Sequence, residues 1–190
     1  MAGRIAFRPL TRADLPTLQR WLNTPHVYEW WGVTSGPDSL GGPGTDAATD
    51  AQMEEKYGAP LDHGDTTHRH IITLDERPIG LIQWYRLVDE PEYAAQIGEM
   101  EPGGAGIDLL VGEIDAIGRG LGAAVLDAYV SSVVFVDPTV TRAIGAPHPS
   151  NSRSCRAFEK AGFVFVRNAD VPDEGPERVH VRSRPARIVE

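Results

Sequence analysis

The chain has 190 residues, of which 41% are apolar and 24% are charged, as in a globular protein that buries one core. Its net charge of −9 argues against nucleic-acid binding, which needs a basic surface, and its single cysteine, Cys155, excludes an internal disulfide. No apolar run approaches the ~18 residues that span a bilayer, and the N-terminal residues lack the apolar core of a signal peptide, so we expect a cytoplasmic protein without a membrane partner.

The chain begins with the pattern of a strand followed by a helix. Residues Ile5–Pro9 place two apolar side chains on one face, as a strand does. Thr11 and Asp14 form a variant of the capping box before an apolar stripe that runs to Leu22. Asn23-Thr24-Pro25 then predicts the end of this helix.

A stretch dense in aromatic residues, His26–Gly32, follows. Its adjacent Trp30 and Trp31 cannot both face the core from one regular element, so we expect one of them in a cleft or at its rim. Residues 33–45 are rich in Gly, Pro and Ser and predict a flexible loop insertion. Residues 46–57 have the pattern of a polar surface helix.

The next segment combines two strands with an acidic run. Residues 68–74 and 77–87 predict strands joined by a turn, and residues 89–104 predict an acidic loop. From Leu87 to Gly118 there is no basic residue, and the carboxylates are Asp89, Glu90, Glu92, Glu99, Glu101, Asp108, Glu113 and Asp115. Such a run is either a solvated surface or, beside an active site, a trap for a cationic small molecule.

A strand, a glycine-rich turn and a helix form the centre of the sequence. The strand Ile107–Val111 carries one polar side chain, Asp108, and the turn Gly118-Arg-Gly-Leu-Gly122 opens a helix predicted to reach Val136. A glycine turn at a helix N-terminus aims several backbone N–H groups at one place, where a phosphate binds well. Tight packing alone would also account for these glycines.

The rest of the chain completes a mixed fold. We expect a strand over residues 140–146, a helix from Asn151 to Ala161 ended by Gly162, and closing strands at 164–166 and 179–181. This order predicts an α/β (α+β) fold with helices on both faces of a mixed sheet. We expect a single domain over residues 1–190, with a loose tail at 185–190.

The glycine turn and the segment Asn151–Phe163, which ends in Phe-Glu-Lys-Ala-Gly-Phe, together resemble the GNAT superfamily of acetyl-CoA-dependent N-acetyltransferases. The resemblance implies a mostly antiparallel twisted sheet and acetyl-CoA as co-substrate. His63, His68 and His70 lie close together in the sequence, but a metal site would need further well-placed ligands, so we expect no metal. Ile117 stands where the family often has Arg or Gln, which leaves binding through backbone amides intact. The coenzyme-binding residues implied are Leu110, Val111, Gly118, Arg119, Gly120, Leu121, Gly122, Ala123, Asn151, Phe158 and Lys160.

A narrower resemblance covers most of the chain. Stretches such as Glu29-Trp-Trp-Gly32, Gly106-Ile-Asp108 and Pro172-Asp173 are similar to the aminoglycoside 6′-N-acetyltransferases that confer antibiotic resistance. The resemblance implies that Asp108 lies at the amine, as base or amine-positioning carboxylate. The acceptor-binding residues expected are Trp30, Trp31, Gln83, Tyr85, Asp89, Glu92, Asp108 and Asp173, and Glu90 is considered with the loop acids.

Two residues depart from that subfamily. Phe158 stands where a Tyr is usually credited as general acid, and Ala146 where an Asp helps to hold the antibiotic. A thiol has a pKa near ~8.5, so its thiolate can leave without an acid, and we expect slower turnover. An Asp of ordinary pKa is a weak base, so Asp108 needs a raised pKa or else serves to orient the ammonium. The resemblance implies an oxyanion donor in the backbone N–H of Leu110 or Val111.

Three functions remain open on the sequence. The first is acetyl transfer to a cationic aminoglycoside by a monomer or homodimer. The second is acylation of another amine, such as a siderophore precursor, a polyamine or a protein N-terminus. The third is a non-catalytic acyl-CoA-binding protein, which the departures at Phe158 and Ala146 favour.

Overall fold

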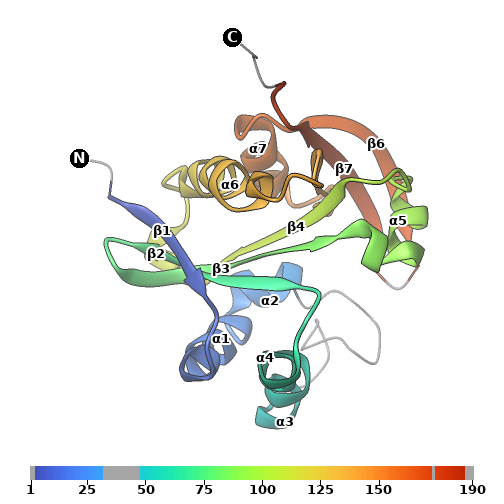
Figure 1. Cartoon of the computed structure of the whole chain (residues 1–190). Coiled ribbons are helices and arrows are strands. Elements are labelled where there is room, and N and C mark those ends of the chain that lie inside the picture. The colour runs from blue at the N-terminus through green and yellow to red at the C-terminus, as the bar shows by residue number, and fades with distance from the viewer. Residues whose placement is uncertain (1–2, 32–47, 173, 187–190) are drawn as a thin grey trace.

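The structure, a computed structural model, describes residues 3–31, 48–172 and 174–186. Its centre is a seven-stranded sheet in the order β1-β2-β3-β4-β5-β7-β6, with helices on both faces (Figure 1). The β4–β5 pair is parallel, and the other described pairs are antiparallel. The strands are β1 Ile5–Pro9, β2 His68–Leu74, β3 Arg77–Arg86, β4 Gly104–Val111, β5 Arg142–Gly145, β6 Val164–Val171 and β7 Gly175–Ser183. The predicted fold class is therefore confirmed.

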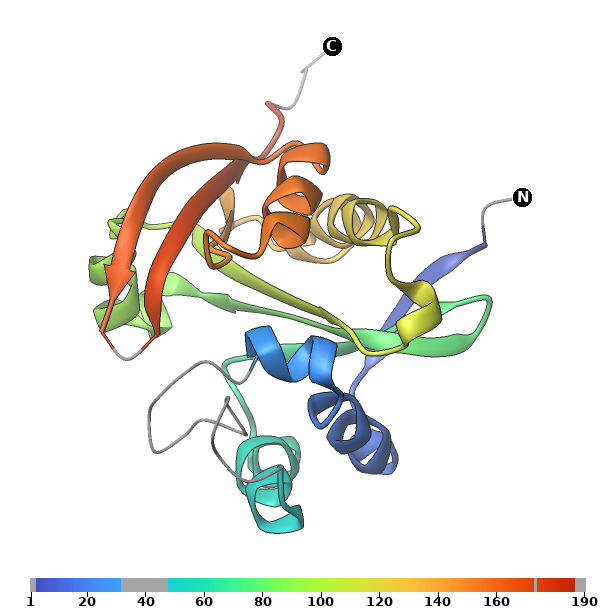
Figure 2. The same cartoon turned by 180° about the vertical axis from the view of Figure 1, so that it is seen from behind.

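Helices cover the two faces of the sheet unequally (Figures 1 and 2). One face carries α6, Leu121–Ser132, and α7, Ser152–Lys160. The helices of the other face are α1 Leu15–Leu22, α2 Pro25–Trp31, α3 Asp50–Met53, α4 Ala59–His63 and α5 Pro91–Ile97. None of the helices in the described part of the chain is long and apolar enough to cross a membrane.

The strands build a core on each face because alternate side chains point in opposite directions. On β4, Ala105 and Ile107 pack in the core beneath α6, whereas Leu110 packs with the residues of α1 on the other face. On β7, Val179 packs with α5. Asp108 is therefore on the face of α1–α5, and the helices α6 and α7 lie behind it.

The sheet opens between its two parallel strands. β4 pairs with β5 only at Gly104, Ala105 and Gly106, and the described strands part beyond that point. The backbone N–H of Gly112 donates to Ile79 of β3, so by antiparallel alternation residues 107, 109 and 111 turn their backbone groups away from β3. These groups face the opening between β4 and β5.

Two prolines begin helices that the sequence did not predict. Pro25, expected only to end a helix, is the first residue of α2, where its missing N–H costs nothing. Pro91 likewise begins α5 inside the expected acidic loop, and Gly98 ends it in the left-handed conformation, with φ 73°. The prediction of a loop over residues 89–104 is therefore wrong for Pro91–Ile97, and Pro25–Trp31 form a helix for which no element was predicted.

Other boundaries differ by a turn or a few residues. The expected helix at 46–57 continues through a π-helical turn, Glu54–Gly58, to the end of α4, and its residues 46 and 47 lie outside the described residues. α6 ends at Ser132, and a short 3-10 turn follows at Val134–Val136. The closing strands β6 and β7 are longer than predicted. Most of the expected loop at 33–45 and tail at 185–190 lies outside the described residues.

Candidate active site

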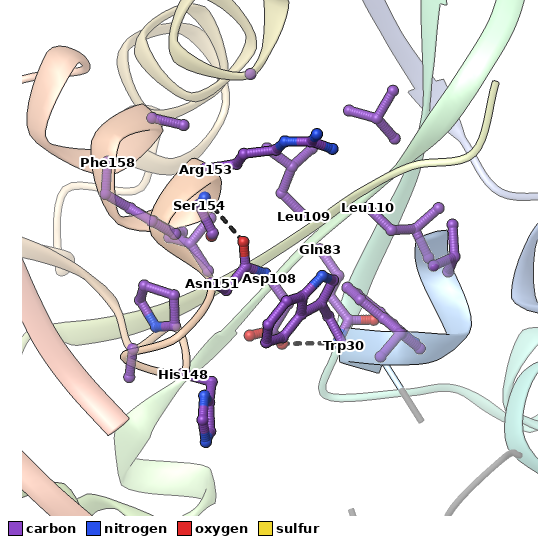
Figure 3. A pocket seen from close by; sticks show the side chains of 18 of the residues that line it. Trp30, Gln83, Asp108, Leu109, Leu110, His148, Asn151, Arg153, Ser154 and Phe158 are labelled. Atoms are coloured by element: carbon purple, nitrogen blue, oxygen red, sulfur yellow. Dashed lines mark hydrogen bonds between the residues drawn. The ribbon is translucent and has the colours of Figure 1, made fainter. Parts of the chain in front are cut away.

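A cavity of about 1120 Å³ lies where β4 and β5 separate (Figure 3). Its walls come from both sides of the sheet: α2, α5 and the β6–β7 turn on one side, and the N-terminal ends of α6 and α7 on the other. The expected acceptor and coenzyme residues that line it are Trp30, Trp31, Gln83, Tyr85, Asp108, Leu110, Val111, Gly118, Gly120, Leu121, Gly122, Ala123, Asn151, Phe158 and Lys160.

The glycine turn forms an anion-binding end of the cavity. Gly118 and Gly120 have φ of 77° and 75°, a backbone conformation that L side chains rarely adopt. Gly120 is the N-cap of α6 and provides no capping side chain, so the first N–H groups of the helix stay open to a ligand. Those groups and the positive end of the helix dipole suit a phosphate. Arg119 lies instead in a shallow groove beside Asp115, apart from this cavity.

The neighbouring helix α7 adds positive charge to the same end. Arg153, Arg156 and Lys160 line the cavity from this helix. Asn151 begins it, since its Oδ1 accepts the backbone N–H of Ser154 at 3.0 Å (Figure 3). The sequence pointed to Asn151 and Lys160 through the resemblance alone, and it gave no reason to single out the two arginines.

The third glycine of the turn lies beside α7. A Cβ at Gly122 would lie 3.4 Å from the Cβ of Ala157, an ordinary van der Waals contact. Tight packing therefore does not explain the glycines of this turn. Gly118 and Gly120 are instead favoured by their positive φ.

Phe158 presents a carbon ring to the cavity. Its ring is buried, and a Cβ at Gly145 would overlap it. The ring packs edge-on against Phe163 at 5.0 Å between centroids and stacks on His180 at 6.1 Å. The residue therefore supplies shape to the cavity wall and no proton donor.

Asp108 occupies the middle of the cavity wall, opposite Gln83 in the β3–β4 register. Gln83 Nε2 donates to Asp108 Oδ2 at 2.8 Å (Figure 3). Burial raises the pKa of the Asp108 carboxyl above its ordinary value, and the hydrogen bond from Gln83 partly offsets that rise. A buried carboxylate with a raised pKa is a better proton acceptor than an exposed one.

The two adjacent tryptophans divide as the sequence predicts. Trp31 packs against the core of α1 and α3, and its Nε1 donates to the Tyr57 hydroxyl at 3.4 Å. Trp30 faces the cavity, and its ring centroid lies 6.0 Å from that of His148 on the opposite wall. The indole of Trp30 is therefore available to contact a ligand.

The acidic run does not form one surface. Of its eight carboxylates only Glu90 and Asp108 line the cavity, and Asp89 and Glu92 are exposed outside it. Glu99 pairs with arginines of other strands, and Asp115 pairs with Arg77. The interpretation of the whole run as a trap for a cation is therefore wrong, because arginines distant in the sequence neutralise part of it. Asp173 lies outside the described residues.

Other acids take that place. Glu174 and Glu177 line the cavity near Asp108, and Tyr93 lies with them. Glu29 lines the cavity from α2. Burial and the neighbouring Glu174 raise the pKa of the Glu177 carboxyl to about 8. The sequence offered no signal for Glu177, because its direction depends on the register of β7 in the sheet.

Two histidines of β2 pack against aromatic side chains. His68 stacks on Trp84 at 4.4 Å between ring centroids, and His70 contacts Tyr129. Among the described residues no group of His, Cys, Asp and Glu could hold a metal ion.

Comparison with known proteins places the chain among acetyltransferases. Residues 11–171 match the family model described as Acetyltransferase (GNAT) domain. The chain is 33% identical over 182 residues to an aminoglycoside N(6′)-acetyltransferase type 1 of Klebsiella pneumoniae, covering 96% of this chain and 84% of the relative. It is 26% identical over 175 residues to the lysine N-acyltransferase MbtK of a Mycobacterium species, covering 90% and 64%.

A solved structure with bound ligands has the same fold. The aminoglycoside acetyltransferase AAC(6′)-Ib, in complex with coenzyme A and kanamycin, superposes with a TM-score of 0.73 at 30% identity, over 95% of each chain.

Proposed function

The chain belongs to the GNAT acetyltransferase family, and from that premise we propose that it transfers the acetyl group of acetyl-CoA to the 6′-amine of an aminoglycoside. One observation carries the proposal: the cavity has ends of opposite charge. Backbone N–H groups and the cations of α7 line the α6–α7 end. Carboxylates together with Lys56 line the other, and Asp108 lies between the two ends. An anionic coenzyme and a cationic acceptor would therefore bind from opposite sides.

The α6–α7 end fits the phosphates of a coenzyme. The backbone N–H groups of Leu121, Gly122 and Ala123 offer directed donors, and Arg153 and Arg156 offer charge. The opening between β4 and β5 leaves a path from this end to Asp108, along the unpaired edge of β4. Acetyl-CoA supplies the activated acyl group as a thioester.

Two protein groups serve the transfer itself. Asp108 orients the amine and accepts its proton, directly or through water, as the C–N bond forms. A backbone N–H on the open edge of β4 stabilises the charge that develops on the thioester oxygen. Alternation directs the N–H of Leu110 to Leu81 of β3, so of the two expected donors Val111 is the one that faces the opening. The carbonyl of Val111 accepts a hydrogen bond from His26 Nε2 at 3.1 Å.

The departing sulfur receives no proton from residue 158. The C–S bond breaks to give a thiolate, whose ordinary pKa near ~8.5 makes it an adequate leaving group. Phe158 forms the cavity wall beside the leaving thiolate and has no proton to donate. The thiolate is therefore protonated by solvent. This arrangement lowers the rate without changing the reaction.

The acceptor end suits a polycation with sugar rings. Carboxylates at Asp108, Glu174 and Glu177 attract ammonium groups, and the faces of Trp30 and Tyr85 pack against rings. The relatives that share most of the chain are named for aminoglycosides, and a structural neighbour holds kanamycin. The lysine N-acyltransferase relative keeps acylation of another amine as the second candidate.

Release of free coenzyme thiol from acetyl-CoA tests the proposal. We expect release that depends on kanamycin and an acetylated 6′-amine in the product, and cells that express the chain should become less susceptible to kanamycin. No release with any aminoglycoside, together with release when a lysine side chain is offered, would replace the first function by the second. Binding of acetyl-CoA without release for any amine would favour a non-catalytic protein. A cytoplasmic location and a monomeric or dimeric state remain predictions.

A further inference from the structure

A buried carboxyl group lies in the acceptor end of the cavity, away from the reacting amine. Glu177, on β7, is 8% exposed and lines the cavity. The hydroxyl of Tyr93 on α5 donates to its Oε2 at 3.1 Å. Within residues 3–31, 48–172 and 174–186, no basic nitrogen lies within ion-pair distance of this carboxyl.

The sheet places Glu177 on the same face as Asp108. Glu177 and Val179 are two residues apart on β7, so both side chains point to the face that α5 covers. Gln83, Tyr85 and Asp108 point to the same face from β3 and β4. Asp108 is close enough to Glu177 for its negative charge to raise the pKa of the Glu177 carboxyl. The two carboxyls are therefore separate groups on one wall of the cavity, which Tyr85 and Tyr93 also line.

A buried carboxylate is costly unless a cation or hydrogen bonds compensate it. The hydroxyl of Tyr93 compensates it in part. Glu174 on the adjacent turn adds a like charge and also shares a hydrogen bond with the Glu177 carboxyl, which raises the pKa of Glu177. Asp108, Glu174 and Tyr93 all act on Glu177, and Lys56 acts on Glu174. Burial and Glu174 raise the pKa of Glu177 to about 8, so the free protein holds a proton there at neutral pH. An incoming ammonium group can replace that proton.

We infer that Glu177, held by Tyr93 and supported by Glu174, binds a second ammonium group of the acceptor while Asp108 serves the amine that is acetylated. The inference rests on the proposed function and deepens it, because it requires an acceptor with at least two cationic amines. Binding of such an acceptor releases a proton from Glu177. Its affinity therefore rises with pH toward about 8, as long as the amines stay protonated.

The test compares two acceptors on the wild-type chain and on Glu177→Gln. Kanamycin carries several amines, and 6-amino-6-deoxyglucose carries one. We expect Glu177→Gln to raise KM for kanamycin at least tenfold, to leave kcat within threefold, and to leave kcat/KM for the monoamine within twofold. Glu101→Gln, at a glutamate that is 86% exposed, lies outside the cavity and pairs with Arg142, is the matched control and should change none of these values.

A second measurement does not depend on turnover. Calorimetric titration of kanamycin in buffers of different ionisation enthalpy reports the protons released on binding. We expect release by the wild-type chain at pH 7 and a loss of most of it in Glu177→Gln. Tyr93→Phe removes the hydrogen bond that lowers the pKa of Glu177, so this variant should bind kanamycin more weakly and still release the proton. Thermal unfolding should show Glu177→Gln to be folded, since the variant removes a buried acid.

The outcomes separate the inference from the function. Acetylation of kanamycin with an unchanged KM in Glu177→Gln would overturn the second subsite and leave the proposed function standing. Equal loss of kcat/KM for both acceptors would assign Glu177 a structural role and would also overturn the inference. Absence of acetylation together with Glu177-dependent proton release on binding would reject the function and retain the subsite.

Discussion

Replacing Asp108 by Asn tests the reacting end of the site with little change of shape. An Asn side chain fills the same volume, and its oxygen can still accept the hydrogen bond that Gln83 Nε2 donates at 2.8 Å. The change removes the proton acceptor and one negative charge. General base catalysis contributes about 10²–10⁴-fold, so we expect kcat/KM for kanamycin to fall by about that factor.

Stability separates this effect from misfolding. Burial raises the pKa of the Asp108 carboxyl in the folded state, so the ionised group costs stability at every pH above its ordinary value of 3.8. Removal of that charge should leave the melting temperature of Asp108→Asn equal to or above that of the wild type at pH 7. The variant is therefore expected to be slow but well folded.

The assay is coenzyme-thiol release at saturating acetyl-CoA, with thermal unfolding on the same preparations. Asp127→Asn is the matched control, because Asp127 is 62% exposed on α6 and lies outside the cavity. A value of kcat/KM within threefold of the wild type would refute the role of Asp108 as base and as positioning group. A large fall in both rate and melting temperature would show that the effect is structural.

Three further changes test other parts of the description. Phe158→Tyr restores a hydroxyl at the cavity wall, and kcat should rise about tenfold if protonation of sulfur is limiting; an unchanged steady-state rate would show that it is not. Gly120→Ala places a side chain at φ 75°, which costs about 1 kcal/mol. The variant should have a raised KM for acetyl-CoA and little change in KM for kanamycin. An equal rise in both KM values would contradict a turn that binds only the coenzyme. Asp14 accepts from Arg8 and Thr11, and those bonds lower its pKa from 3.8 to about 2, so its contribution of about 1–2 kcal/mol is present above pH 4 and lost as pH falls toward 2. Urea unfolding of Asp14→Asn should show that loss at pH 7 and no difference from wild type near pH 2.

Local signals in the sequence predicted the centre of the fold. The strand 107–111, the helix start at Asn151 and the helix end at Gly162 each depend on neighbours within a few residues, and the structure has all three. Proline was misleading at Pro25 and Pro91, because the same residue that ends one helix can begin the next. The sequence pattern alone does not distinguish those two uses.

The acceptor end was harder to predict because it is assembled from distant segments. Asp108 stood out as the polar residue of an apolar strand, but Glu177 became visible only through the pairing of β7 with β5 and β6. The acidic run failed for the opposite reason. Arg77 lies far from Asp115 along the chain yet forms two hydrogen bonds to its carboxylate, so local charge counting overstated the field there.

The three-residue contact between β4 and β5 has a mechanical consequence. It divides the sheet into two plates, β1–β4 and β5–β7–β6, joined by a short seam. A molecule that fills the seam adds cohesion between the plates and shifts the folding equilibrium by mass action, about 2.7 kcal/mol at a concentration one hundred times its Kd. The stability of the protein in a cell therefore depends on the concentration of the coenzyme. A compound designed to bind between β4 and β5 as an inhibitor would also protect the protein from unfolding and proteolysis.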